Sequence, residues 1–310
     1  MASFSILNMI ESEIKSGLKC ERIAFPGSSF NKLYAYQFSK SNSANRVVHG
    51  LGVDLNEKKA IIKGFVEFHE RNAFFDIGVA NGFTSTNGIA GHRFYLLARN
   101  SAIAEITERD SLLMHWYSET PFKHIKSPKI FDSYKLSLAR GGYEILFVVT
   151  TLGFSKTTVC FLINKKTLGF VIGLSSGRSE VDDSQKAFTE ALVNLHFGGY
   201  GKSIDEQQHD LLTNGLTSLT NHRCYWLYKS TLPSWVLENL EYQLKSNKAA
   251  APEVTEIFHK KHGSVHIVGV AVSNSFNLEL GYPSKETVSL LSTRLEKKYN
   301  YDKIEAHPIP

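Results

Sequence analysis

Hydrophobic and polar positions along the chain follow two periods, and the period changes from segment to segment. Apolar residues at helical spacing predict helices, whereas short apolar runs and strict alternation predict strands. The predicted helices cover residues 5–18, 55–75, 96–117, 183–197, 234–246 and 284–298. The predicted strands cover residues 33–38, 144–153, 157–164, 169–176 and 264–273. Because helices and strands interleave throughout, we expect a mixed α+β (α/β-type) fold with mixed sheets, in a single domain over residues 1–310.

A loop rich in glycine, asparagine and hydroxyl side chains separates the second and third predicted helices. It covers residues 81–92, NGFTSTNGIAGH, and contains two Asn-Gly pairs. Flexible segments of this kind present backbone N–H donors to phosphate groups. The loop contains neither GxxxxGK[ST] nor GxGxxG, so it is neither a P-loop nor a dinucleotide-binding fingerprint.

The helices on either side of this loop carry the same pattern of acidic, basic and small residues. Residues 60–71 read AIIKGFVEFHER and residues 98–109 read ARNSAIAEITER. In each copy two glutamates are three residues apart and an arginine follows the second one: Glu67, Glu70 and Arg71, then Glu105, Glu108 and Arg109. A fainter third copy at residues 187–194 has Asn194 in the place of the first glutamate.

Helix geometry gives this pattern a chemical meaning. Residues three apart lie on one helix face, with their Cβ atoms about 5–6 Å apart, and small residues nearby let a backbone or a ligand approach. Two such helices facing each other would bring four carboxylates together, which requires cations such as Mg²⁺ with phosphate oxygens. The alternative is that Glu67 with Arg71, and Glu105 with Arg109, are ordinary i,i+4 ion pairs on a solvated face.

Composition narrows the class of protein and its compartment. The chain has 35 Lys and Arg against 30 Asp and Glu, a formal net charge of +5, and 42% hydrophobic residues. Such a mild excess of positive charge does not indicate nucleic-acid binding. No signal peptide is evident and no apolar run approaches about 18 residues, so we expect no membrane span. Three widely spaced cysteines favour a reducing compartment, and we predict a cytoplasmic protein.

Two further patterns could carry chemistry but are more simply structural. Glu256, His259 and His262 have the spacing of metal ligands on a helix, with His266 close behind, yet FHKKHG reads as a solvated helix end closed by Gly263. Cys160 lies inside an apolar strand and is expected in the core, as are Trp116 and Tyr117, while Cys20, Cys160 and Cys224 have no paired spacing.

The paired motifs resemble those of the YcaO family. That family's earlier motif, G-E-x-x-E-R, appears at residues 66–71 as VEFHER. Its second motif, S-N-G-x-A-x-G and then A-x-x-x-A-x-x-E-x-x-E-R-[DY], appears as TNGIAG at residues 86–91 and as residues 98–110. The end of the chain, HPIP at residues 307–310, resembles the P-x-P-x-P terminus of azoline-forming members, with Ala306 replacing the first proline. The resemblance covers residues 10–310.

The resemblance implies an ATP- and Mg²⁺-dependent cyclodehydratase of ribosomal-peptide (RiPP) biosynthesis, of the bacteriocin and antibiotic type, with a YcaO-like domain around a nucleotide cleft. In similar enzymes a Cys, Ser or Thr side chain adds to the preceding carbonyl, and ATP activates the oxygen that leaves as phosphate, giving a thiazoline or oxazoline. By this resemblance, Mg²⁺ ligands would be Glu67, Glu70, Glu105 and Glu108. The nucleotide would also be contacted by Arg109, Arg71, Lys63, Ala90, Arg93 and Glu190. Pro310 and Arg109 would act in catalysis, Pro310 through its carboxylate.

Three positions depart from the family pattern. Leu97 stands where an acidic residue is common, Lys63 replaces a serine, and Asn194 replaces a carboxylate for which Glu190 is a substitute. The length leaves little room for a leader-binding domain, so we expect a leader-peptide-binding partner protein that presents the precursor peptide. A flavin dehydrogenase partner and a homodimer are left open. Thioamide or amidine formation and a non-catalytic scaffolding subunit are the alternative functions.

Overall fold

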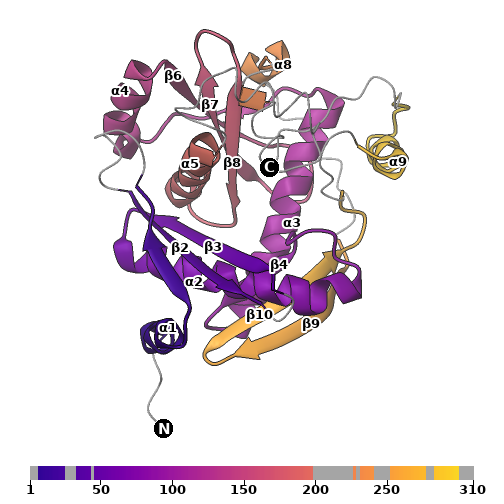
Figure 1. Cartoon of the computed structure of the whole chain (residues 1–310). Helices are drawn as coiled ribbons and strands as arrows, with labels where there is room; N and C mark the ends of the chain where they lie inside the picture. The colour runs from indigo at the N-terminus through magenta and orange to yellow at the C-terminus, as the bar shows by residue number, and fades with distance from the viewer. Residues whose placement is uncertain are drawn as a thin grey trace. The chain divides into compact units, whose positions relative to one another are not determined.

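A computed structural model describes residues 6–24, 33–42, 45–197, 226–227, 231–240, 252–276 and 283–299 (Figure 1). The chain divides into two compact units. Unit 1 comprises Met1–Ile106 and Glu253–Ser273, and unit 2 comprises Thr107–Pro252 and Asn274–Pro310. Helix α3, Tyr95–Ser118, contributes residues to both units. The prediction of a single domain over residues 1–310 stays a prediction.

Unit 1 contains two three-stranded antiparallel sheets, with strand orders β1-β2-β3 and β4-β10-β9. Its strands are β1 Lys19–Arg22, β2 Tyr34–Ser41, β3 Val47–Asp54, β4 Ile89–His92, β9 Val254–His262 and β10 Val265–Val272. Its helices are α1 Ile6–Lys15, α2 Glu57–Ala73 and the first part of α3, with a π turn at Phe74–Gly78 and a 3₁₀ turn at Val79–Asn81.

Helix α2 begins at a side-chain cap and lies directly on the backbone of the first sheet. The side chain of Asn56 accepts a hydrogen bond from the Lys59 N–H at 3.1 Å, which satisfies one free donor of the first turn. A Cβ atom added to Gly52 of β3 would lie 1.9 Å from the Ala60 carbonyl oxygen and 2.2 Å from the Gly64 nitrogen. The small residues of the repeated pattern therefore let helix and strand backbones touch.

In the described part of unit 2 the strands form a four-stranded antiparallel sheet, in the order β5-β6-β7-β8. Its strands are β5 Lys123–His124, β6 Tyr143–Val149, β7 Thr157–Asn164 and β8 Phe170–Ser176. Its helices are the rest of α3, α4 Asp132–Arg140, α5 Glu180–Phe197, α8 Ser234–Leu237 and α9 Lys285–Arg294, with a 3₁₀ turn at Lys129–Phe131. Nearly every residue of β7 and β8 is buried, as expected of strands covered on both faces.

The β8–α5 pair repeats the contact between β3 and α2. A Cβ atom on Gly173 of β8 would lie 2.0 Å from the Ala187 carbonyl oxygen and 2.5 Å from the Ala191 nitrogen. Ala187 and Ala191 thus correspond to Ala60 and Gly64, as the faint third copy of the sequence pattern predicted. The same alignment places Asn194 at the position of Glu67.

Most predicted elements are confirmed, and several details are wrong. Residues 254–262 form strand β9, where the sequence suggested a helix end, and residues 89–92 of the predicted loop form strand β4. The helix predicted at 234–246 ends at Leu237, and residues 241–246 lie outside the described part. The strand pairs within the described sheets are antiparallel rather than mixed.

Three expectations about burial and membrane spans can also be compared with the structure. Cys160, Trp116 and Tyr117 are buried as expected, and Cys224 lies outside the described residues. Across the segments that the structure describes, none of the helices combines the length and the apolar character needed to cross a bilayer.

Candidate active site

The first glutamate of the earlier motif is tied to both the strand and the helix beside it. Glu67 Oε2 accepts the backbone N–H of Leu51 in β3 at 3.0 Å. Its Oε1 atom accepts from Arg71 Nη2 at 2.6 Å and from Arg71 Nε at 3.0 Å, so the i,i+4 ion pair forms. The side chains of Glu67 and Arg71 remain 30% and 42% exposed, which leaves both within reach of a ligand.

The second glutamate joins α2 to the glycine-rich segment. Glu70 Oε1 accepts the backbone N–H of Gly91 in β4 at 2.5 Å. A Cβ atom on Gly91 would lie 2.6 Å from Val66 Cγ1 and 3.2 Å from Glu70 Oε1, so the close approach requires glycine. The acidic helix and the loop singled out in the sequence therefore meet inside unit 1.

Glu67, Glu70 and Glu105 form an acidic trio in unit 1. Burial and the neighbouring carboxylates of Glu67 and Glu105 together raise the pKa of Glu70 to about 8, against the opposing effects of the Gly91 N–H and Arg71. Glu70 keeps some solvent exposure, yet enough protein surrounds its carboxyl group to disfavour the charged form. A site of this kind, with several oxygen ligands and too little positive charge, fits a divalent hard cation.

A second group of charged residues lies in unit 2 and consists of Glu108, Arg109, Lys186 and Glu190. Glu108 is buried, accepts the Ser176 N–H at 2.6 Å and lies 3.4 Å from Lys186 Nζ. Glu190 Oε2 accepts the Leu174 N–H at 3.2 Å. Burial raises the pKa of Glu190, and Glu108 adds to this effect, whereas Lys186 and Arg109 lower it.

Lys186 is the residue that sequence reasoning missed. It precedes Glu190 by one helical turn in α5, and its ammonium group approaches Glu108, which is distant in sequence. An i,i+4 Lys–Glu pair is visible in the sequence of the helix predicted at 183–197, but the repeated pattern has no lysine at this position and does not single it out. With Arg109, it gives this group two cations that could contact phosphate oxygens.

Two polar residues of the motifs have structural roles. Asp110 is fully buried and forms a bidentate ion pair with Arg294, at 2.5 Å from Nη1 to Oδ1 and 2.9 Å from Nη2 to Oδ2. It also accepts the Phe276 N–H at 3.1 Å. Asn194 donates to the Ile172 carbonyl oxygen at 2.7 Å, so it binds strand β8 where Glu67 binds strand β3.

The remaining predicted contacts are dispersed within unit 1. Lys63 donates to Asp54 at 2.6 Å and to the Val53 carbonyl oxygen at 3.3 Å, which ties α2 to the end of β3. Ala90 is buried and pairs with Val268 of β10. Arg93 is exposed over the Phe94 ring, at 5.7 Å from its centroid, and Leu97 is 46% exposed. Pro310 and the other terminal prolines lie outside the described residues.

Together, these observations describe an α+β protein with a group of buried or half-buried carboxylates in each of its two units. The family model described as YcaO cyclodehydratase, ATP- and Mg²⁺-binding, matches residues 79–284, and the chain belongs to the YcaO family. ATP and Mg²⁺ are therefore the cofactors of its family, as the motifs implied. Among curated proteins, none matches the sequence.

Solved structures share the fold at low sequence identity. A heterocyclase in complex with substrate and cofactor is 11% identical, with a TM-score of 0.62 over 94% of this chain, which spans only 54% of the heterocyclase. YcaO from Methanopyrus kandleri, bound with AMPPCP and Mg²⁺, is 12% identical, with a TM-score of 0.58 over 87% of this chain and 89% of that one. The E. coli microcin synthetase McbBCD complex contains a chain 14% identical, with a TM-score of 0.52 over 83% and 88%. These likenesses establish the fold.

Proposed function

We propose that this protein is an ATP- and Mg²⁺-dependent cyclodehydratase that forms thiazoline or oxazoline rings in a ribosomal precursor peptide. The observation that carries the proposal is the family match over residues 79–284 together with the acidic trio, in which Glu70 has a pKa of about 8. Bound Mg²⁺–ATP would supply a phosphoryl group for the amide oxygen that is lost. The residues of this chain bind and orient that nucleotide.

The acidic trio and Glu108 are the proposed Mg²⁺ ligands, because they present the oxygen donors this ion prefers. Arg71, Arg109 and Lys186 are the proposed phosphate contacts, since each cation already lies beside one of these carboxylates or beside Glu190. Lys63 is less suited to this role because its ion-pair partner, Asp54, is not one of these carboxylates.

The partners belong to the same proposal. A precursor peptide would be the substrate, and a separate leader-binding protein would present it. The E. coli microcin synthetase McbBCD complex has also been solved with pro-MccB17 bound, so a chain of this fold occurs in a complex that binds another molecule of that kind. Pro310 remains the proposed catalytic terminus, with its carboxylate orienting or deprotonating the substrate.

Nucleotide binding is tested first, by calorimetric titration of the chain with Mg²⁺ and the ATP analogue AMPPCP. Glu105→Gln removes one charge from the acidic trio and should weaken binding at least about tenfold, or about 1.4 kcal/mol. Glu11→Gln, at an exposed position of α1, is the matched control and should bind like the wild type. Equal binding by the wild type and Glu105→Gln would show that the acidic trio is not part of the nucleotide site.

The reaction is tested with the precursor peptide and leader-binding protein encoded beside this chain. Each azoline should lower the peptide's mass by one water and consume one ATP. A gain in mass from replacement of oxygen by sulfur would indicate thioamide formation instead. No nucleotide turnover in the complete complex, with an intact fold, would indicate a scaffolding subunit instead.

A further inference from the structure

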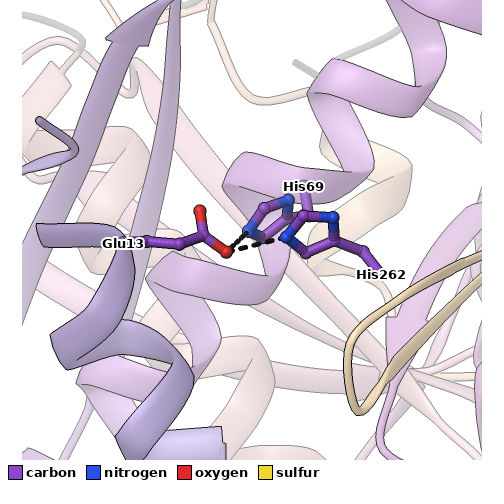
Figure 2. Close-up of side chains that lie close together, drawn as sticks. All are labelled: Glu13, His69 and His262. Carbon is purple, nitrogen blue, oxygen red and sulfur yellow. Dashed lines mark hydrogen bonds and ion pairs between the residues drawn. The ribbon is translucent and has the colours of Figure 1, made fainter. Parts of the chain in front are cut away.

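Outside the proposed nucleotide site, unit 1 brings a carboxylate and two imidazoles together from three separate elements. Glu13 comes from α1, His69 from α2 and His262 from the last residue of β9. One potential ligand atom of each residue lies within 4.8 Å of the other two. Figure 2 shows both imidazole rings beside one carboxylate oxygen of Glu13. Glu13 Oε1 lies 3.2 Å from His69 Nε2 and 2.8 Å from His262 Nε2.

His69 supplies a second, independent indication of a ligand. Its side chain is only 8% exposed, and packing against Phe65 and Phe68, at ring-centroid distances of 4.5 and 5.1 Å, fixes the ring. Nevertheless, its Nε2 atom forms no hydrogen bond of acceptable geometry with any described residue, although Glu13 is close enough for an ion pair. A buried ring nitrogen that is aimed at a carboxylate and an imidazole, without a well-formed hydrogen bond, is suited to coordinate a metal.

We propose that Glu13, His69 and His262 form a binding site for a divalent zinc-type metal ion. Two imidazole nitrogens and one carboxylate oxygen are a ligand set that Zn²⁺ accepts, with water as the fourth ligand in a tetrahedral site. Mg²⁺ and Ca²⁺ prefer oxygen ligands throughout, so the two imidazoles distinguish this site from the acidic trio. The His262 side chain is 43% exposed, which leaves room for that water.

The surrounding structure holds the three ligands in place. Met9, one turn before Glu13 in α1, accepts hydrogen bonds at its sulfur from the Ser264 N–H at 3.1 Å and the Ser264 hydroxyl at 2.9 Å. Gly263, between His262 and Ser264, has a φ of 54°, and a Cβ atom there would lie 2.5 Å from Met9 Cε. The turn from β9 to β10 is therefore seated against α1, and a metal ion would fasten both to α2.

Of the two lysines beside His262, one lies on the opposite face of the strand, and the other, which lowers the pKa of His69, has its charge offset by an ion pair. Strand alternation places Lys261 on the opposite face of β9 from His262. Lys260 shares the face of His262, but it forms an ion pair with Asp76 at 3.0 Å.

The test measures metal content and metal-dependent stability of the tag-free full chain. After incubation with Zn²⁺ in excess Mg²⁺ and removal of free metal, elemental analysis should find one Zn²⁺ per chain. Co²⁺ in its place should give the intense visible absorption of tetrahedral coordination. Zn²⁺ should raise the melting temperature of the wild type. Both His69→Gln and the exposed His262→Gln should lose the bound metal and this rise in melting temperature, and His262→Gln keeps the test valid if His69→Gln fails to fold.

A second pair of histidines in the same hairpin provides the control. His259 and His266 are stacked, with His259 Nε2 2.9 Å from His266 Nδ1, so they could also attract a metal ion. His259→Gln should keep one Zn²⁺ per chain, as should Glu105→Gln in the acidic trio. Absence of Zn²⁺ from the wild type, its retention in His262→Gln, or its loss in His259→Gln would overturn the proposal. None of these outcomes depends on nucleotide binding.

Discussion

Protonation of one buried histidine should destabilise unit 2 in mild acid. His115 is fully buried in α3, and its Nε2 atom accepts the backbone N–H groups of Thr151 at 2.8 Å and Leu152 at 3.1 Å. Nδ1 therefore carries the proton and donates to the Thr120 carbonyl oxygen at 3.0 Å. A second proton on Nε2 would face two donors and break both bonds.

The magnitude follows from the difference between the folded and unfolded proton affinities. Burial lowers the pKa of His115 from its ordinary value of 6.5 to about 4. Below pH 6.5 the unfolded chain therefore binds a proton that the folded chain still refuses, and stability falls as the pH drops from 6.5 towards 4. Relative to pH 7.5, the loss from this residue is about 2 kcal/mol at pH 5 and about 3 kcal/mol near pH 4.

Tryptophan fluorescence reports on the correct unit, because the chain's three tryptophans, Trp116, Trp226 and Trp235, all belong to unit 2. Urea unfolding should be measured at pH 7.5 and pH 5 for the wild type and His115→Gln. The variant starts from a lower stability at pH 7.5, and its loss on acidification should be about 2 kcal/mol smaller than that of the wild type. The same substitution at half-buried His124 should retain the wild-type loss. Equal losses in wild type and His115→Gln would refute the reasoning.

Two further substitutions test contacts described above. Arg294→Gln leaves the Asp110 carboxylate buried without its cation and should lower the free energy of unfolding in urea by about 3–5 kcal/mol. Adding Asp110→Asn should restore much of that free energy. A loss below about 1 kcal/mol in Arg294→Gln would contradict the buried ion pair. Gly91→Ala places a methyl group against Val66 and Glu70, so we expect about 1–3 kcal/mol of destabilisation together with weaker Mg²⁺–AMPPCP binding. Wild-type melting and binding would show that the contact relaxes without consequence.

Much of the fold could be predicted because local periodicity and local chemistry agree. The apolar runs at 157–164 and 170–176 are buried strands, and the small residues at Ala187 and Ala191 mark a helix that touches one of them. Strand β9 could not be recognised, since its acidic residue and histidines at intervals of three resemble a helix face. Its conformation is decided by pairing with β10 across the turn at Gly263, which is a non-local interaction.

The residues of the acidic trio could be singled out from the sequence, but their contacts could not. The motif spacing indicated Glu67, Glu70 and Glu105, and the structure shows that Glu67 and Glu105 both raise the pKa of Glu70. No sequence rule relates Glu108 to Ser176 or Lys186, which approach it from more than sixty residues away. Similarly, Glu13 and His262 are neighbours at a sequence separation of 249 residues, so their meeting with His69 needed coordinates.

The direct backbone contact between β3 and α2 limits which substitutions this chain can accept. No side chain separates Gly52 from Ala60, so main-chain atoms set the distance between α2 and the sheet at this point. The hydrogen bond from the Leu51 N–H holds the Glu67 carboxylate beside β3 at the distance that this contact sets. Substitutions on the solvent-facing side of α2 should therefore leave this spacing unchanged, whereas a methyl group at position 52 would push α2, and Glu67 with it, away from β3.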